Sequence, residues 1–124
     1  MDKYFIVSIG AALGGALRYW TATFIHKLLP VYFPYGTLTV NFAGSFLLGF
    51  FVFYLDEKGF ISPAVKIFLT VGFCGGYTTF STFSLETLNL LKDSQFILAS
   101  LNVLGNVFLS LFAVYLSYII SKLI

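Results

Sequence analysis

Four long apolar stretches, joined by connections of three to seven residues, dominate the pattern of hydrophobic and polar positions along the chain. Each stretch is long enough to cross the hydrocarbon core of a bilayer, which takes about 20 apolar residues in a helix. The short connections leave no room for a separate extramembrane domain. The pattern therefore predicts an all-α membrane protein with a single four-helix transmembrane domain over residues 1–124. The predicted crossings are 4–29, 35–55, 63–91 and 95–122.

The third apolar stretch is interrupted by the sequence GFCGGYTTFSTFS at residues 72–84. Gly75 and Gly76 provide conformational freedom there, and a run of threonines and serines follows them. Irregular backbone at membrane depth is tolerated where it is buried in protein or lines water, and freed carbonyl groups are good ligands for Na⁺ or another hard cation. The sequence predicts a broken third helix with a role in a cation site or ion pathway. A closely packed glycine kink is the alternative.

The fourth stretch carries three polar residues in register. Asn102, Asn106 and Ser110 stand at i, i+4 and i+8, so they share one face of a helix that is otherwise largely apolar. Three polar residues aligned on one helix face indicate the wall of a hydrated pathway. A polar seam between two helices would give the same pattern.

Polar residues also occur inside the first two stretches. Thr37, Asn41, Gly44 and Ser45 recur at helical spacing, so the second helix has one small, polar face. Asn41 can line a wet vestibule or join two helices by hydrogen bonds. Arg18 lies about midway along the first stretch, where it either attracts an anion or donates to backbone carbonyls.

The composition agrees with a membrane protein. Hydrophobic residues make up 59% of the chain and charged residues only 10%, against about 25% charged in a typical soluble domain. The mean hydropathy is +0.94. The net charge of +2 and the absence of a basic run argue against a nucleic-acid partner. No nucleophile–base pair or metal-ligand cluster indicates an enzyme.

The charges give little bias in orientation. The N-terminus, the second connection and the C-terminus share one side of a four-crossing chain, and the remaining connections lie on the other. A chain with so weak a bias can insert in both orientations. The lysines of the first side are Lys3, Lys58, Lys66 and Lys122, and those of the second are Lys27 and Lys92.

Three segments, GALRYW, GTLTVNFAGSFLLGF and GFCGGYTTFSTFS, together resemble the Fluc family of fluoride channels, also called CrcB-like proteins. The resemblance covers all four stretches. It implies a fluoride-selective channel that exports cytoplasmic fluoride passively down its electrochemical gradient. It also implies an antiparallel, dual-topology homodimer with two pores, as a multi-pass protein of a bacterial or archaeal inner (plasma) membrane.

The resemblance further implies roles for individual residues. The backbone carbonyls of Gly75 and Thr78 from each subunit would hold a structural Na⁺ at the dimer centre. The family has a row of polar residues, its polar track, along the fourth helix. This track often has hydroxyl groups at the positions of Asn102 and Asn106, and the next position of the track in this chain, Val114, is apolar. The implied pore residues are Asn41, Phe80, Phe83, Ser110, Asn106, Asn102, Thr37, Arg18, Ser81 and Thr82.

Two other classes of protein fit parts of the pattern. A small four-helix, proton-coupled drug exporter needs a carboxylate buried in a span, and Glu86 is the only candidate in this chain. A membrane scaffold without transport explains the small-residue faces, but it explains neither the stripe on the fourth helix nor the broken third helix.

Overall fold

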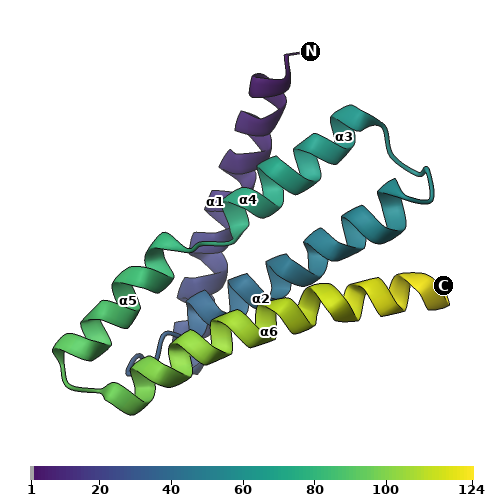
Figure 1. Cartoon of the computed structure of the whole chain (residues 1–124). Coiled ribbons are helices and arrows are strands. Elements are labelled where there is room, and N and C mark those ends of the chain that lie inside the picture. Colours follow the sequence, from purple (N-terminus) through teal and green to yellow (C-terminus); the bar gives the residue numbers. More distant parts are fainter. Residues whose placement is uncertain (1) are drawn as a thin grey trace.

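The computed structural model describes residues 2–124, which form helices joined by short turns and, within that range, no strand (Figure 1). Two segments, η1 and η2, have the wider turn of a π-helix and continue the α-helices that precede them. The elements are α1 (Lys3–Leu28), α2 (Tyr35–Phe50), η1 (Phe51–Asp56), α3 (Pro63–Ile67), η2 (Phe68–Cys74), α4 (Gly75–Tyr77), α5 (Ser81–Lys92) and α6 (Phe96–Leu123).

Local sequence accounts for the ends of α1 and for the turns. The Asp2 side chain caps α1 by accepting a hydrogen bond from the Tyr4 backbone N–H at 2.9 Å. Leu29 is extended because it precedes Pro30, which disfavours a helical conformation in the residue before it. Gly59, in the connection after η1, has a φ of +78°, a conformation that favours glycine.

Two of the helices within residues 2–124 are long and apolar enough to cross a membrane by themselves. One is the continuous helix Tyr35–Asp56, made of α2 and η1, and the other is α6. Their apolar side chains face outward more often than inward, since only about a fifth of each candidate span is buried. The fold is thus that of a helical membrane protein, and the count of four crossings stays a prediction.

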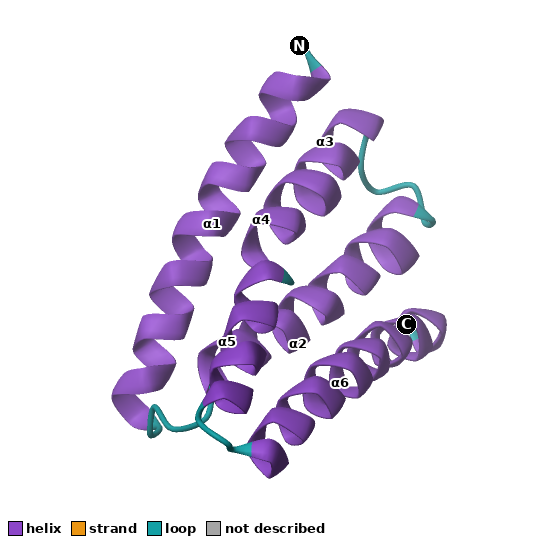
Figure 2. Ribbon diagram, turned by 60° about the vertical axis from the view of Figure 1, so that its left-hand side comes forward, coloured by secondary structure: helices purple, strands orange, loops and turns teal. Residues whose placement is uncertain are grey.

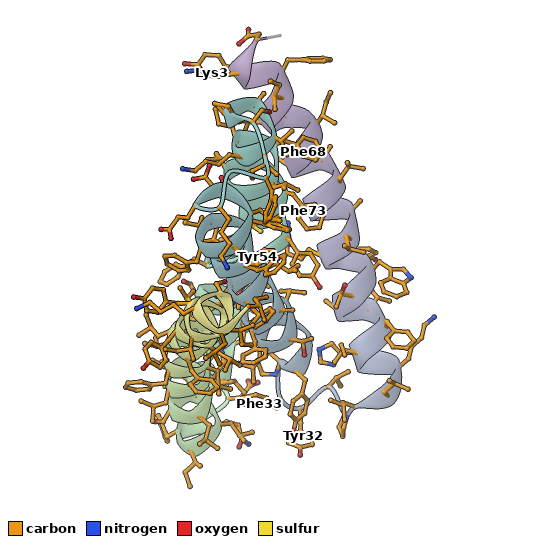
Figure 3. All side chains as sticks on the ribbon, turned by 90° about the vertical axis from the view of Figure 1, so that its right-hand side faces the viewer. Lys3, Tyr32, Phe33, Tyr54, Phe68 and Phe73 are labelled. Carbon is orange, nitrogen blue, oxygen red and sulfur yellow. The ribbon has the colours of Figure 1, made fainter. Side chains whose placement is uncertain are left out.

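The helices α2 and α6 pack along each other and run in the same direction (Figure 1). The helix α1 lies on the other side of the molecule, packed against η2 and α4 (Figure 2). The N-terminal end of α1, the connection between η1 and α3, and the C-terminus lie toward one end of the molecule, while the other two connections lie toward the opposite end (Figure 1). Figure 3 shows Lys3 at the first end and Tyr32 at the second.

Glycine lets α1 approach the third helix closely. A Cβ atom on Gly76 would stand 2.5 Å from the carbonyl oxygen of Ala11, and a Cβ on Gly10 would stand 2.6 Å from that of Phe68. Both obstacles are backbone atoms, which cannot turn away. Glycine at these two positions therefore makes the close approach of the helices possible.

The position of the helix break differs from the sequence prediction. Gly75 has helical dihedral angles, and the short α4 that it begins continues to Tyr77. The chain leaves the helix at Thr78, where φ is −89° and ψ is 159°, and α5 begins at Ser81. The prediction of a broken third helix is confirmed, but Gly75 and Gly76 do not form the break. Gly76 is needed for packing against α1 instead.

Candidate ion pathway

Asn41 holds the break in the third helix in place. Its side-chain Oδ1 accepts a hydrogen bond from the Thr79 backbone N–H at 2.8 Å, and its Nδ2 donates to the Thr79 carbonyl at 3.1 Å. The side-chain amide thus pairs with both backbone groups of one residue, as a neighbouring strand would. Because an unpaired peptide group in a membrane costs several kcal/mol, this pairing explains how the break is tolerated.

A chain of side-chain hydrogen bonds leads from Asn41 along α6. Asn41 Nδ2 donates to Asn106 Oδ1 at 2.8 Å, and Asn106 Nδ2 donates to Asn102 Oδ1 at 3.0 Å. Asn102 Nδ2 then donates to Thr87 Oγ1 at 3.0 Å, and the Thr87 hydroxyl donates to the Phe83 carbonyl at 2.8 Å. Each side chain in this series donates to the next, so every hydrogen bond runs in the direction from Asn41 to Phe83. We call these four side chains, Asn41, Asn106, Asn102 and Thr87, the amide chain.

The amide chain uses most of its own donors. Asn41 gives its Nδ2 hydrogens to Thr79 and Asn106, and Asn106 gives its own to the backbone and side-chain oxygens of Asn102. Asn102 and Asn106 are buried. In this conformation Asn106 therefore joins α6 to α2, and Asn102 joins α6 to α5. This arrangement is the polar seam between helices that the sequence allowed as an alternative to the wall of a hydrated pathway.

The parallel packing of α2 on α6 sets a constant register. Asn41 bonds Asn106, which lies 65 positions later in the chain. Two turns further on, Gly49 faces the turn of α6 from Val114 to Ser117: a Cβ there would meet the Ser117 side chain first and would stand 3.2 Å from the carbonyl of Val114. The same register places Ser45 opposite Ser110, one turn beyond the pair Asn41 and Asn106.

A groove with a volume of about 500 Å³ opens beside the contact between α2 and α6. It is bounded by α2, η2, the break and α6. It is mostly apolar, with a few hydroxyl and amide groups, and it contains five of the predicted pore residues and both predicted cation ligands. Those pore residues are Asn41, Phe80, Phe83, Asn106 and Ser110, and the cation ligands are Gly75 and Thr78.

Phe80 and Phe83 form an edge-to-face pair at the groove, with ring centroids 5.3 Å apart. Phe83 is buried, whereas Phe80 is 77% exposed. The rim of an aromatic ring carries partial positive charge, which attracts anions. A large apolar ring so exposed also indicates that lipid or another chain covers it.

Arg18 connects α1 to the end of α4. Its Nε donates a hydrogen bond to the Gly76 carbonyl at 3.0 Å, and one turn later in α1 the hydroxyl of Thr21 accepts from the Tyr77 hydroxyl at 3.0 Å. Gly76 lies just before the break, where helical carbonyl groups lose their partners. The contact corresponds to the structural alternative that the sequence gave for Arg18, and Arg18 does not line the groove.

The remaining predicted pore residues lie near the groove but not in its lining. Thr37 is buried at the start of α2. Thr82 donates its backbone N–H to the Thr79 hydroxyl at 3.1 Å, which caps the start of α5, and Ser81 is exposed beside it. The residues Thr79 and Thr87, which the sequence did not single out, hold the break and the far end of the amide chain. Thr79 could have been found from its place in the TTFST run.

Three carbonyl groups beside the break, those of Gly75, Tyr77 and Thr78, have no hydrogen-bond donor among residues 2–124. The carbonyls of Cys74, Gly76 and Thr79 all accept hydrogen bonds. Free carbonyl oxygens at a helix break are hard ligands suited to Na⁺. Gly75 and Thr78 are therefore among the residues that meet the chemical requirement for the cation site predicted for them.

The fold and the groove define a small helical membrane protein with a mostly apolar groove, carrying a few hydroxyl and amide groups, beside a broken helix. A family model described as CrcB-like protein, Camphor Resistance (CrcB), matches residues 5–118. The chain therefore belongs to the CrcB-like family, as its sequence motifs indicated.

Relatives resemble it over its whole length. A protein named fluoride-specific ion channel FluC from Flavobacterium psychrophilum is 43% identical over 122 residues, or 98% of both chains. Proteins of the same name from Sulfurihydrogenibium sp. and Paramagnetospirillum magneticum are 37% and 42% identical. Each match covers 100% of this chain, and it covers 100% and 98% of the respective relative.

Proposed function

We propose that this protein is a fluoride-selective ion channel and that the groove beside the break in the third helix is part of its pathway. The observation that carries the proposal is similarity over the whole chain to proteins named fluoride-specific ion channels. The groove supplies a location, because hydroxyl groups, two amides and two phenylalanine rings meet in it. The family is one of ion channels, so the chain is not an enzyme.

Fluoride is small and strongly hydrated, so a selective pathway must replace its water with hydrogen-bond donors and ring edges. Phe80 and Phe83 provide ring edges, and hydroxyl groups of the groove provide donors. A larger anion such as chloride gains less from each short contact and fits a narrow site less well. Transport is passive and follows the electrochemical gradient, which in the cell moves fluoride out of the cytoplasm.

The pathway is completed by a second copy of the chain in an antiparallel, dual-topology homodimer. Two observations support this proposal: the groove is open on one side, and Phe80 and Gly75 are exposed at its edge. A free carbonyl group at membrane depth belongs against another protein surface rather than against lipid tails, and the exposed Phe80 ring lies at the same edge. The weak charge bias of the connections is compatible with insertion in both orientations.

A structural Na⁺ is held at the centre of this dimer by the carbonyl oxygens of Gly75 and Thr78 from both subunits. The lack of donors to these two oxygens supports the assignment. The ion supplies positive charge next to an anion pathway and ties the two broken helices together. The residues that hold the break, Asn41 and Thr79, then fix where the carbonyl of Thr78 lies.

The membrane is the inner (plasma) membrane, crossed by all four apolar stretches. The helices Tyr35–Asp56 and Phe96–Leu123 support two crossings directly. The helix α1, with 26 residues, and the broken helix from α3 to α5 lie beside them and span a comparable extent (Figure 2).

The test is anion efflux from liposomes that contain the purified protein, with matched gradients of fluoride and chloride. We expect rapid release of fluoride and negligible release of chloride. Phe80→Ile is the variant to compare, because it keeps an apolar side chain while removing the ring edge, and Phe108→Ile on the exposed face of α6 is its control. Folded, dimeric protein that releases neither anion would favour a membrane scaffold instead.

A further inference from the structure

Ser45 lines the groove, and its hydroxyl forms no hydrogen bond within α2. Serine and threonine side chains within helices commonly return their hydrogen bond to a carbonyl one turn earlier, and Thr39, Thr70 and Ser84 do so in this chain. No residue from 2 to 124 forms a hydrogen bond with the Ser45 hydroxyl or with that of Ser110. Both serines are in the lining of the groove.

The register of α2 on α6 brings these two serines together. Asn41 bonds Asn106 on one side of them, and Gly49 packs on the Ser117 side chain and the carbonyl of Val114 on the other. Asn41 and Asn106 are separated by 65 positions. Since the helices run parallel, Ser45 and Ser110 occupy the intermediate turn with the same separation.

The neighbouring turn offers few donors in comparison. Both Asn41 and Asn106 already donate their Nδ2 hydrogens within the amide chain. An anion that leaves the Phe80 and Phe83 rings along α6 therefore meets its next free donors at the serine pair. A hydroxyl can direct its single hydrogen at an anion, and hydrogen bonds to a charged acceptor are stronger than those between neutral groups.

We propose that Ser45 is an anion-binding residue of this chain and forms, with Ser110, a two-hydroxyl site for fluoride. The two hydroxyls, one from each helix, each donate one hydrogen bond to the same ion. Asn106, in contrast, is a positioning residue that holds Asn41. The inference rests on the proposed function, since it names donors within the proposed pathway.

The test is fluoride efflux from liposomes, measured over a series of internal fluoride concentrations for wild type, Ser45→Ala and Ser110→Ala. We expect each variant to raise the half-saturating fluoride concentration about tenfold, as the loss of one hydrogen bond to a charged ligand predicts. Ser45→Thr keeps the hydroxyl and should stay within about twofold of wild type. Ser100→Ala, on the exposed face of α6, is the matched control.

Size-exclusion chromatography separates a binding role from a structural one. If Ser45→Ala forms as much dimer as wild type and has an unchanged half-saturating concentration, the inference is wrong. If Ser45→Ala does not assemble, Ser45→Cys is measured in its place, because a thiol is a weaker donor of nearly the same size. Wild-type protein that releases no fluoride would overturn the proposed function itself, whereas a silent Ser45→Ala beside an active wild type overturns only the serine site.

Discussion

The side-chain amide of Asn41 pairs with both backbone groups of Thr79, which lies 38 positions later in the chain. This contact joins the middle of α2 to the break between α4 and α5. It satisfies the backbone at the point where a membrane helix loses its own hydrogen bonds. The break is thus a specified feature of the fold, and Asn41 connects it to the amide chain on α6.

Asn41→Asp should abolish most fluoride transport. The carboxylate can still accept from the Thr79 N–H, but it cannot donate to the Thr79 carbonyl or to Asn106, and it brings negative charge beside the groove. We expect efflux to fall at least about tenfold, since the charge repels fluoride and two acceptors lose their donor. Asn89→Asp, at an exposed position of α5, should leave the rate unchanged. A charged Asn41→Asp variant that transports normally would place the pathway elsewhere.

The two asparagines of α6 should act as one unit. Replacing either Asn102 or Asn106 by leucine leaves a buried partner without its hydrogen bond, which costs about 1–3 kcal/mol. The double variant removes the facing groups together, so its loss of stability should be smaller than the two single losses combined. Thermal unfolding of the four proteins in detergent measures this coupling. Additive losses would contradict the amide chain.

Arg18→Gln should retain most of the transport rate, because glutamine carries an N–H donor for the Gly76 carbonyl. Arg18→Leu, of similar apolar size, removes the donor and should lower both the yield of dimer and the rate. Efflux at two ionic strengths distinguishes tethering from attraction of the anion. If Arg18→Gln were as inactive as Arg18→Leu, the positive charge would matter more than the hydrogen bond.

Gly76→Ala should prevent α1 from packing on α4. Its Cβ would stand 2.5 Å from a backbone oxygen of Ala11, and overpacking of this kind costs about 1–3 kcal/mol or more. Gly15→Ala is the matched control, because within residues 2–124 no atom other than those of its own helix backbone and chain neighbours lies within 4 Å of a Cβ there. We expect a lower unfolding temperature for Gly76→Ala only. Equal temperatures for the two variants would show that the helices can separate at little cost.

Removing Na⁺ should weaken the dimer and slow fluoride release. Protein purified with N-methylglucamine as the only cation lacks a ligand for the carbonyls of Gly75 and Thr78, whose lone pairs then repel one another. Restoring Na⁺ should recover the dimer fraction in size-exclusion chromatography and the efflux rate. Unchanged assembly and transport without Na⁺ would remove the cation from the proposal.

The sequence by itself determined the class of protein and most of the helices. Apolar runs of about 20 residues report membrane helices without reference to the rest of the chain, because each helix satisfies its own backbone. The spacing of Asn102, Asn106 and Ser110 placed them on one face for the same local reason. The motifs also sufficed to indicate the family, which the comparisons confirmed.

The tertiary structure decided what the polar residues contact. Gly75 and Gly76 looked like the break, but Gly76 is held against α1, and the helix ends at Thr78, where Asn41 replaces the lost backbone bonds. Likewise, nothing local distinguishes the asparagines of α6 from the serine that follows them. Only the packing of α2 on α6 pairs Asn106 with Asn41 and leaves the Ser110 hydroxyl without a partner among residues 2–124, because hydrogen bonds between helices depend on how the helices pack and not on spacing along either one.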